Sequence, residues 1–277
     1  MGHKNTEMTL MIKARLLPLV ILTLFCLTAN AYGQSEETGL ISLSERLQNP
    51  LSDLLSVSIE DTAYFRYGPG RNETMDTLDF SASLPFHAGA GMDIIVKPDI
   101  PLVYVPWPEK QAGFGDMKIT ALLAGSLHEG ISWGIGPVIG IPTATGDLLG
   151  TGRWTAGPSA ALVYTGRNVV AGVSTYGLFS FAGPVSRGEV DRLYIRPFIY
   201  VNLEKGWYMY IDPEFQCDYN LPGSQQWTVP LGGGIGRTFT AGKQVLSAYV
   251  SCYAKFEHPQ DASDLYMKAG LNLPLGK

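Results

Sequence analysis

From residue 57 to residue 275 the sequence alternates between apolar and polar residues in segments that have the length of β-strands. In residues 207–218, for example, Met209 and Ile211 interleave with Tyr208 and Tyr210. A period of two sends successive side chains to opposite faces of a sheet. Every second gap between segments is a short turn, and the other gaps are longer loops. This pattern is typical of an up-and-down antiparallel β-barrel that crosses a membrane.

The alternation predicts about 12 strands, and an even number returns both ends of the chain to one side of the membrane. The predicted strands are 57–67, 76–86, 91–103, 115–127, 132–142, 154–165, 169–181, 191–203, 207–218, 226–238, 244–257 and 264–275. Several contain proline, for example Pro137, Pro158, Pro213 and Pro230. Proline cannot donate to a β-ladder, so we expect bulges or interrupted pairing at several of these sites.

A soluble β-sandwich also alternates, with its apolar face inward. Three observations favour the membrane barrel. Charged residues make up only 16% of the chain, against about 25% in a typical soluble domain. Tryptophans such as Trp133 and Trp207 open predicted strands, as in the aromatic girdles of membrane barrels. The polar phase carries ionised side chains in layers, which require a wet interior. We therefore predict localisation in the outer membrane of a Gram-negative bacterium.

The N-terminal residues differ from the rest. Residues 1–31 combine a basic start, an apolar core and an Ala-Asn-Ala end, which predicts a signal peptide, with a membrane anchor as the alternative. Residues 32–56 carry leucines at helical spacing and are interpreted as a periplasmic or plug segment, or else as a loose tail. Residues 57–277 form the barrel. Without residues 1–31 the net charge is −7, which argues against a nucleic-acid partner.

Charged residues and tyrosines on the polar phase of the strands are the candidates for lining the lumen. They are Asp93, Lys97, Asp99, Lys118, Arg196, Tyr208, Tyr210, Asp212, Glu214, Asp218, Tyr249, Tyr253, Lys255 and Lys268. Two loops with tryptophan, glycine and charge supply candidates for gating, which are Trp107, Asp147 and Arg153. The tyrosines are suited to stacking on an aromatic solute, but they are equally good as filler in a narrow barrel.

Signals for catalysis are weak. His87 and His128 fall in predicted turns, His258 falls in a predicted loop, and none lies beside a serine on a lumen face. No cluster of residues predicts a metal site, and no motif predicts a cofactor. We expect that the protein is not an enzyme, with a barrel lipid hydrolase as the less favoured alternative.

Several short motifs in order along the chain resemble one family. They are Leu47-Gln48-Asn49-Pro50, Gly115-Asp116, Gly136-Pro137, Gly150-Thr151-Gly152-Arg153-Trp154, Gly157-Pro158 and Trp227-Thr228-Val229-Pro230-Leu231. Together they resemble the outer-membrane transporter-like family called "meta-pathway of phenol degradation" proteins, some of which carry the misleading label neuromedin U. The resemblance implies an outer-membrane barrel that moves small hydrophobic or aromatic compounds, and it carries over no binding residues.

The sequence therefore predicts an outer-membrane channel for the passive passage of small solutes. The lumen carboxylates are expected to disfavour anions. The expected partners are outer-membrane lipid, a small-molecule solute and the barrel-assembly machinery; the oligomeric state stays open. The alternative is a sealed barrel with a structural or adhesive role, its lumen filled by side chains and the N-terminal segment.

Overall fold

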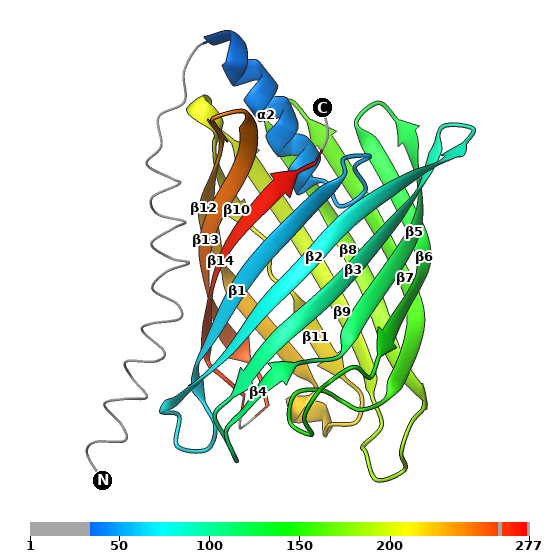
Figure 1. Cartoon of the computed structure of the whole chain (residues 1–277), viewed down its shortest axis with the longest axis vertical. Helices are drawn as coiled ribbons and strands as arrows, with labels where there is room; N and C mark the ends of the chain where they lie inside the picture. Colours follow the sequence, from blue (N-terminus) through cyan, green and yellow to red (C-terminus); the bar gives the residue numbers. More distant parts are fainter. Residues whose placement is uncertain (1–33, 260–261, 276–277) are drawn as a thin grey trace.

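A computed structural model describes residues 34–259 and 262–275 of the chain. The predicted signal peptide, residues 1–31, lies outside the described residues. Helix α2 (Gln34–Gln48) comes first, and a short connection leads from it into a β-barrel (Figure 1). No described helix is both long and apolar enough to cross a membrane.

The described chain forms fourteen β-segments, all antiparallel to their neighbours. They are β1 (Ser56–Tyr67), β2 (Glu73–Gly89), β3 (Met92–Val105), β4 (Gln111–Phe114), β5 (Met117–His128), β6 (Ile131–Ile141), β7 (Trp154–Gly166), β8 (Val169–Ala182), β9 (Asp191–Asn202), β10 (Trp207–Ile211), β11 (Phe215–Asp218), β12 (Trp227–Ala241), β13 (Gln244–Glu257) and β14 (Leu265–Pro274). Single turns of 3-10 helix, η1 (Glu204–Gly206) and η2 (Gly223–Gln225), precede β10 and β12.

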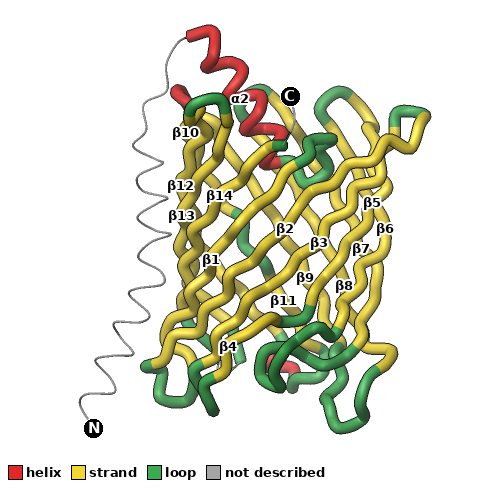
Figure 2. Tube along the Cα trace, in the orientation of Figure 1, coloured by secondary structure: helices red, strands yellow, loops and turns green. Residues whose placement is uncertain are grey.

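The barrel has 12 strands and is closed. β4 and β5 both pair with β3, and β10 and β11 both pair with β9 and β12, so each of these two pairs is one interrupted strand. β1 pairs with β14, from Ser56 opposite Pro274 to Phe65 opposite Leu265, which joins the first strand to the last (Figure 2). The predicted antiparallel barrel and its strand number are therefore confirmed.

The two ends of the barrel differ, as the alternation of gap lengths predicts. One end, called the turn end here, carries the tight turns and α2; the other, the loop end, carries the long connections (Figure 1). Positive φ values at Gly89 (85°) and Asn168 (64°) allow the chain to reverse within a few residues at the turn end. Trp133 and Trp207 open strands at the turn end, and Trp154 and Trp227 open strands at the loop end.

The outer face of the barrel is apolar. Ile135, Leu162 and Met209 are 55%, 48% and 57% exposed on it, whereas Tyr208 and Tyr210, on the opposite phase, are buried inside. A soluble sandwich would bury these aliphatic side chains. Their exposure on a closed barrel fits a surface that contacts lipid.

The division between an apolar outer face and a polar interior is not complete, because apolar side chains also point inward near the turn end. Ile95, Leu122, Val163 and Phe198 form a buried cluster inside the barrel. Their partner is Leu51, from the connection between α2 and β1. Apolar residues thus point toward the axis in this part of the barrel, because here the interior packs on protein instead of water.

Proline interrupts the wall at some of the expected positions. Pro213 separates β10 from β11, and a shift of register lies between Val229 and Pro230. Pro85 and Pro101, by contrast, keep the register of their neighbours. The strand count is therefore unaffected by the prolines.

Candidate functional site: a charged, tyrosine-lined cavity inside the barrel

A cavity of about 550 Å³ lies inside the barrel, between the N-terminal segment and the middle of the strands. Its lining comes mainly from the inward phase of the strands. The candidate lumen residues that line it are Lys97, Asp99, Lys118, Arg196, Tyr208, Tyr210, Asp212, Glu214, Tyr249, Tyr253 and Lys268. Chain segments far apart in sequence therefore meet around one space.

One wall of the cavity is organised around Asp212, which is buried at the break between β10 and β11. The Arg196 guanidinium donates to both of its carboxylate oxygens, with N–O distances of 2.5 Å. The Tyr200 hydroxyl donates to the same carboxylate at 2.6 Å. The backbone N–H of Asp212 donates to the Tyr253 hydroxyl at 3.0 Å. At the break in the strand, the backbone N–H of Asp212 is thus satisfied by a side-chain oxygen.

The opposite wall carries two further ion pairs. Lys268 Nζ lies 2.9 Å from Glu60 Oε1, and the Tyr249 hydroxyl donates to the other oxygen of Glu60 at 2.6 Å. Lys118 Nζ lies 3.3 Å from Asp99 Oδ2. The members of each pair come from different strands, so the pairs link the wall from within. A buried charge is tolerated when it is paired and hydrogen-bonded in this way.

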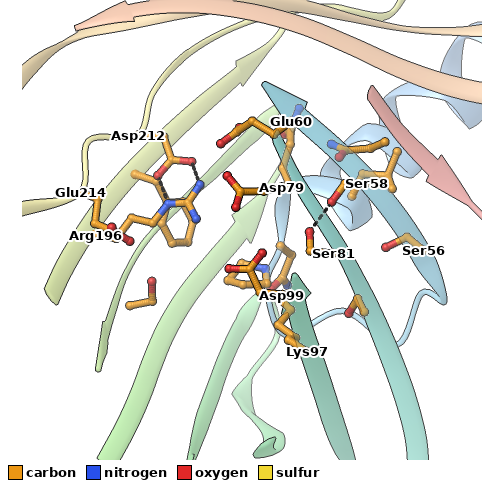
Figure 3. A pocket seen from close by; sticks show the side chains of 18 of the residues that line it. Ser56, Ser58, Glu60, Asp79, Ser81, Lys97, Asp99, Arg196, Asp212 and Glu214 are labelled. Carbon is orange, nitrogen blue, oxygen red and sulfur yellow. Dashed lines mark hydrogen bonds and ion pairs between the residues drawn. The ribbon is translucent and has the colours of Figure 1, made fainter. Parts of the chain in front are cut away.

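Two ionisable side chains of the cavity remain free. Within the described residues, neither the Asp79 carboxyl nor the Lys97 ammonium makes a hydrogen bond or an ion pair with protein. Figure 3 shows Asp79 pointing into the cavity on the wall that faces Arg196 and Asp212. These two side chains are therefore available to a solute.

Tyrosine rings fill the space between the charged groups. Tyr200 stacks on Tyr210, with ring centroids 5.1 Å apart. Tyr249 meets Tyr210 edge to face at 6.0 Å. Nearer the loop end, Tyr253 stacks on Tyr266 at 5.0 Å. The tyrosines thus fill much of the lumen by packing on one another, and they still present ring faces and hydroxyls to the cavity.

Three candidate lumen residues do not line this cavity. Asp93 lies near the turn end, where its carboxylate is 3.1 Å from His87 Nδ1. Asp218 lies near the loop end and pairs with Arg192 at 2.8 Å. Lys255, also near the loop end, donates to the Ser263 hydroxyl at 2.8 Å. They occupy the correct phase of their strands, but their height along the barrel places them beyond the cavity.

Part of residues 34–55, which we call the plug segment, lines the cavity at its turn end. Ser44 donates to the Thr238 hydroxyl at 2.5 Å, in a buried position. The side-chain amides of Gln48 and Asn202 exchange two hydrogen bonds of 2.9 Å. Leu51 completes the inward apolar cluster described above. The segment is therefore fixed by both polar and apolar contacts.

The loop end is narrowed by residues 142–153, which join β6 to β7. Leu149 is buried against Val103 and Val105 on the inner face of β3. Asp116, between β4 and β5, accepts from the backbone N–H groups of Ala144 and Thr151 at 3.2 and 2.6 Å. These contacts fold the loop into the mouth of the barrel.

The candidate gating residues lie outside the cavity, and two of them hold loops together. Asp147 is exposed and lies 3.4 Å from Arg187 Nη1. Arg153 donates to the carbonyl oxygens of Gly183 and Pro184 at 3.3 and 3.1 Å. Trp107 is 40% exposed and lies beside the turn that follows β1. None of the three lines the cavity.

Sequence reasoning missed several residues that organise the site. Glu60 and Asp79 lie on the polar phase of β1 and β2, so their parity could have identified them. Arg187 donates to the backbone oxygens of Asp147 and Gly150 at 2.8 and 2.6 Å. No local pattern predicts that role, because these loops are separate in sequence.

The groups that line the cavity are suited to binding a solute. Among the described residues, no group of three or more His, Cys, Asp or Glu side chains could hold a metal ion. The donors and acceptors of the cavity are ammonium, guanidinium, carboxylate and phenol groups. Such groups can form hydrogen bonds with a polar solute, and the phenol rings can stack on an aromatic one.

Solved structures share this fold. An outer membrane channel from Pseudomonas putida F1 is similar, with a TM-score of 0.60 and 12% identity over 81% of this chain and 97% of that chain. The NanC porin is similar, with a TM-score of 0.53 and 7% identity over 80% of this chain and 100% of that chain. The prediction of an outer-membrane β-barrel fold is therefore confirmed.

Other comparisons found weaker similarity or none. Outer membrane phospholipase A from Escherichia coli gives a TM-score of 0.44 and 11% identity over 79% of this chain and 95% of that chain, which is too distant to support an argument about catalysis. No protein-family model and no curated protein matches the sequence. The resemblance to the "meta-pathway of phenol degradation" family therefore stays a prediction.

Proposed function

We propose that this barrel is an outer-membrane channel for the passive passage of small, semi-polar aromatic solutes. The observation that carries the proposal is the cavity of about 550 Å³, with its mixture of tyrosine rings and ionisable groups. Its volume lies in the usual range for small-molecule sites. The plug segment at one end and residues 142–153 at the other contact the wall through hydrogen bonds that involve side chains.

The balance of charge favours neutral or weakly charged solutes. Five carboxyl groups (Glu60, Asp79, Asp99, Asp212 and Glu214) and five basic groups (Arg46, Lys97, Lys118, Arg196 and Lys268) line the cavity. Four of the basic groups are paired with carboxylates. Because the two numbers are equal, we no longer expect the lumen carboxylates to disfavour anions. Tyrosine faces and hydroxyls supply the remaining selectivity.

The turn end faces the periplasm in this proposal, since short turns are the periplasmic feature of outer-membrane barrels. The plug segment would then be released from the periplasmic side, while residues 142–153 filter solutes at the cell surface. The barrel-assembly machinery remains an expected partner for insertion, and outer-membrane lipid for the apolar wall.

Liposome swelling tests the proposal with the full chain. Proteoliposomes are challenged with isosmotic 4-hydroxybenzoate, 4-hydroxybenzyl alcohol and glucose. We expect the two aromatic solutes to enter faster than glucose, and Tyr210→Leu to reduce that difference because it removes a ring and a hydroxyl from the cavity. Lys243→Ala, in the exposed turn before β13, is the matched control. Equal entry of all three solutes, or none, would contradict the proposal.

A sealed barrel is the second candidate, and the packing of the plug segment on the inner wall favours it. Planar-bilayer recordings distinguish the two, because a sealed barrel carries no current at any voltage.

The lipid-hydrolase alternative gains no support from the three histidines. His87 pairs with Asp93, His128 is exposed, and His258 Nε2 lies 3.1 Å from Asp264. Within residues 34–259 and 262–275, none of these rings is hydrogen-bonded to a serine.

A further inference from the structure

One basic side chain of the central cavity has no carboxylate partner. Of the cations that line the cavity, Arg46, Lys118, Arg196 and Lys268 each pair with a carboxylate. Among residues 34–259 and 262–275, the Lys97 ammonium forms neither an ion pair nor a hydrogen bond. A solute anion can therefore pair with this lysine without displacing a carboxylate of the wall.

Lys97 lies where the ladder between β2 and β3 is interrupted. Pairing stops at Ser81 and resumes at Leu84 in an unchanged register, which places Ser83 on β2 across from Lys97 on β3. The next residue, Pro98, has no N–H to donate to β2. Pro98 belongs to the opposite phase of the strand, yet it lines the cavity together with Ser83 and Lys97. The cavity thus reaches the backbone at this gap.

Hydroxyl groups lie on both sides of this lysine. Thr120 is opposite it on β5, and Ser83 is across from it on β2. On β1, Ser56 is opposite Ser83, and Ser58 is opposite Ser81. The Ser58 and Ser81 hydroxyls share a hydrogen bond of 2.6 Å (Figure 3). In the part of the chain that the structure describes, the hydroxyls of Ser56, Ser83 and Thr120 make no hydrogen bond with protein, so they can donate to a solute oxygen.

A single ammonium among neutral hydroxyls suits an anion that carries one charge. The ammonium has three N–H donors, and the two oxygens of a carboxylate can accept from it and from neighbouring hydroxyls at once. Asp99, two residues along β3, pairs with Lys118 at 3.3 Å. Its carboxylate repels a second negative charge near Lys97. The site therefore fits a carboxylate better than a divalent anion.

We propose that Lys97, with the hydroxyls of Ser83 and Thr120, is a binding subsite for the carboxylate of small aromatic monoacids. The inference rests on the proposed function and names its solute class. Tyr200 and Tyr210 line the same cavity, and their rings supply faces on which the aromatic part of such a solute can stack. The subsite thus holds the charged end of the solute, and the tyrosines accommodate its ring.

Equilibrium dialysis with the full chain in detergent tests the subsite. The ligands are radiolabelled 4-hydroxybenzoate and 4-hydroxybenzyl alcohol, which differ only in the carboxylate. Lys97→Met removes the ammonium and keeps an unbranched side chain, whereas Lys97→Arg keeps the charge. Lys255→Met is the matched control, because it removes a lumen cation that lies beyond the cavity and is bonded to Ser263. A shift of gel mobility on heating checks that each variant is folded.

We expect Lys97→Met to bind 4-hydroxybenzoate roughly 10- to 100-fold more weakly than the unaltered protein, since the lost hydrogen bond is to a charged group. Ser83→Ala should weaken binding by a smaller factor. Lys97→Arg and Lys255→Met should bind the acid as the unaltered protein does, and all variants should bind the alcohol equally.

Unchanged affinity of Lys97→Met for the acid would overturn the subsite. An equal loss in Lys255→Met would also overturn it, by indicating a general effect of lumen charge, as would an equal loss in Lys97→Arg or no binding by the unaltered protein. Liposome swelling tests the proposed function separately. If both aromatic solutes enter while Lys97→Met binds the acid normally, only the subsite fails; if neither solute enters with the unaltered protein, the proposed function fails.

Discussion

Leu51→Ala tests directly whether the plug segment controls access to the cavity. The Leu51 side chain is 7% exposed and packs with Ile95 and Val163, which are both fully buried. The fit is tight, since a Cβ on Gly134 would lie 2.5 Å from Leu51 Cδ2. Removal of the isopropyl group therefore leaves a void that its neighbours on rigid strands cannot fill.

Replacing a buried leucine by alanine lowers stability by about 2–5 kcal/mol. The loss lies at the lower end of that range when the segment that carries the residue can shift. A loss of about 2–3 kcal/mol raises the released fraction of the plug segment roughly 30- to 150-fold, since 1.4 kcal/mol corresponds to a factor of ten. The hydrogen bonds from Ser44 and Gln48 remain, each contributing about 0.5–1.5 kcal/mol. Opening is therefore expected to be frequent but reversible.

Planar-bilayer recording measures the effect as the frequency of openings per inserted molecule. The matched control is Leu162→Ala, which removes the same group from a lipid-facing side chain that is 48% exposed. We expect more openings in Leu51→Ala and no change in Leu162→Ala. The reasoning is refuted if Leu51→Ala behaves like the unaltered protein, or if the unaltered protein conducts continuously, because the plug segment would then not obstruct the lumen.

Arg187→Ala is expected to release residues 142–153, since Arg187 binds the backbone of that loop; faster amide exchange confined to the loop would be the sign, and unchanged exchange would count against the role. Lys268→Met leaves Glu60 without its cation and should shift the reversal potential in a KCl gradient toward K⁺ selectivity; a shift toward Cl⁻ would contradict the assignment. Arg196→Met leaves the Asp212 carboxylate buried and unpaired, which should lower the free energy of unfolding by about 3–5 kcal/mol; unfolding by guanidinium in detergent measures this. The double variant with Asp212→Leu should recover most of the loss, and a double variant as unstable as the single one would argue against an effect of unpaired charge.

The sequence alone predicted the barrel because the period-two pattern is local. Each side chain on a strand goes to one face or the other, and parity can be read without knowledge of the partner strand. Parity assigned Lys97, Asp212 and Lys268 to the interior, where the structure places them. Parity could not give height along the barrel, since that depends on register and tilt, and for this reason Asp93, Asp218 and Lys255 lie beyond the cavity.

Loop roles were beyond sequence reasoning for a related reason. Asp147 and Arg153 stood out by their charge, but the residue that orders the loop is Arg187, which belongs to the following loop. Pairing between separate loops is created only when neighbouring strands bring their ends together.

The sequence by itself thus determined the class of fold, the apolar outer face and the identity of most charged residues inside, because each follows from a repeat that two or three neighbouring residues define. Tertiary structure decided which charges pair and how Leu51 packs with inward apolar side chains to make part of the interior apolar. Glu60 and Lys268 are 208 positions apart in the chain, and they meet only because the first strand closes on the last. Such contacts depend on closure of the whole barrel, which no local pattern encodes.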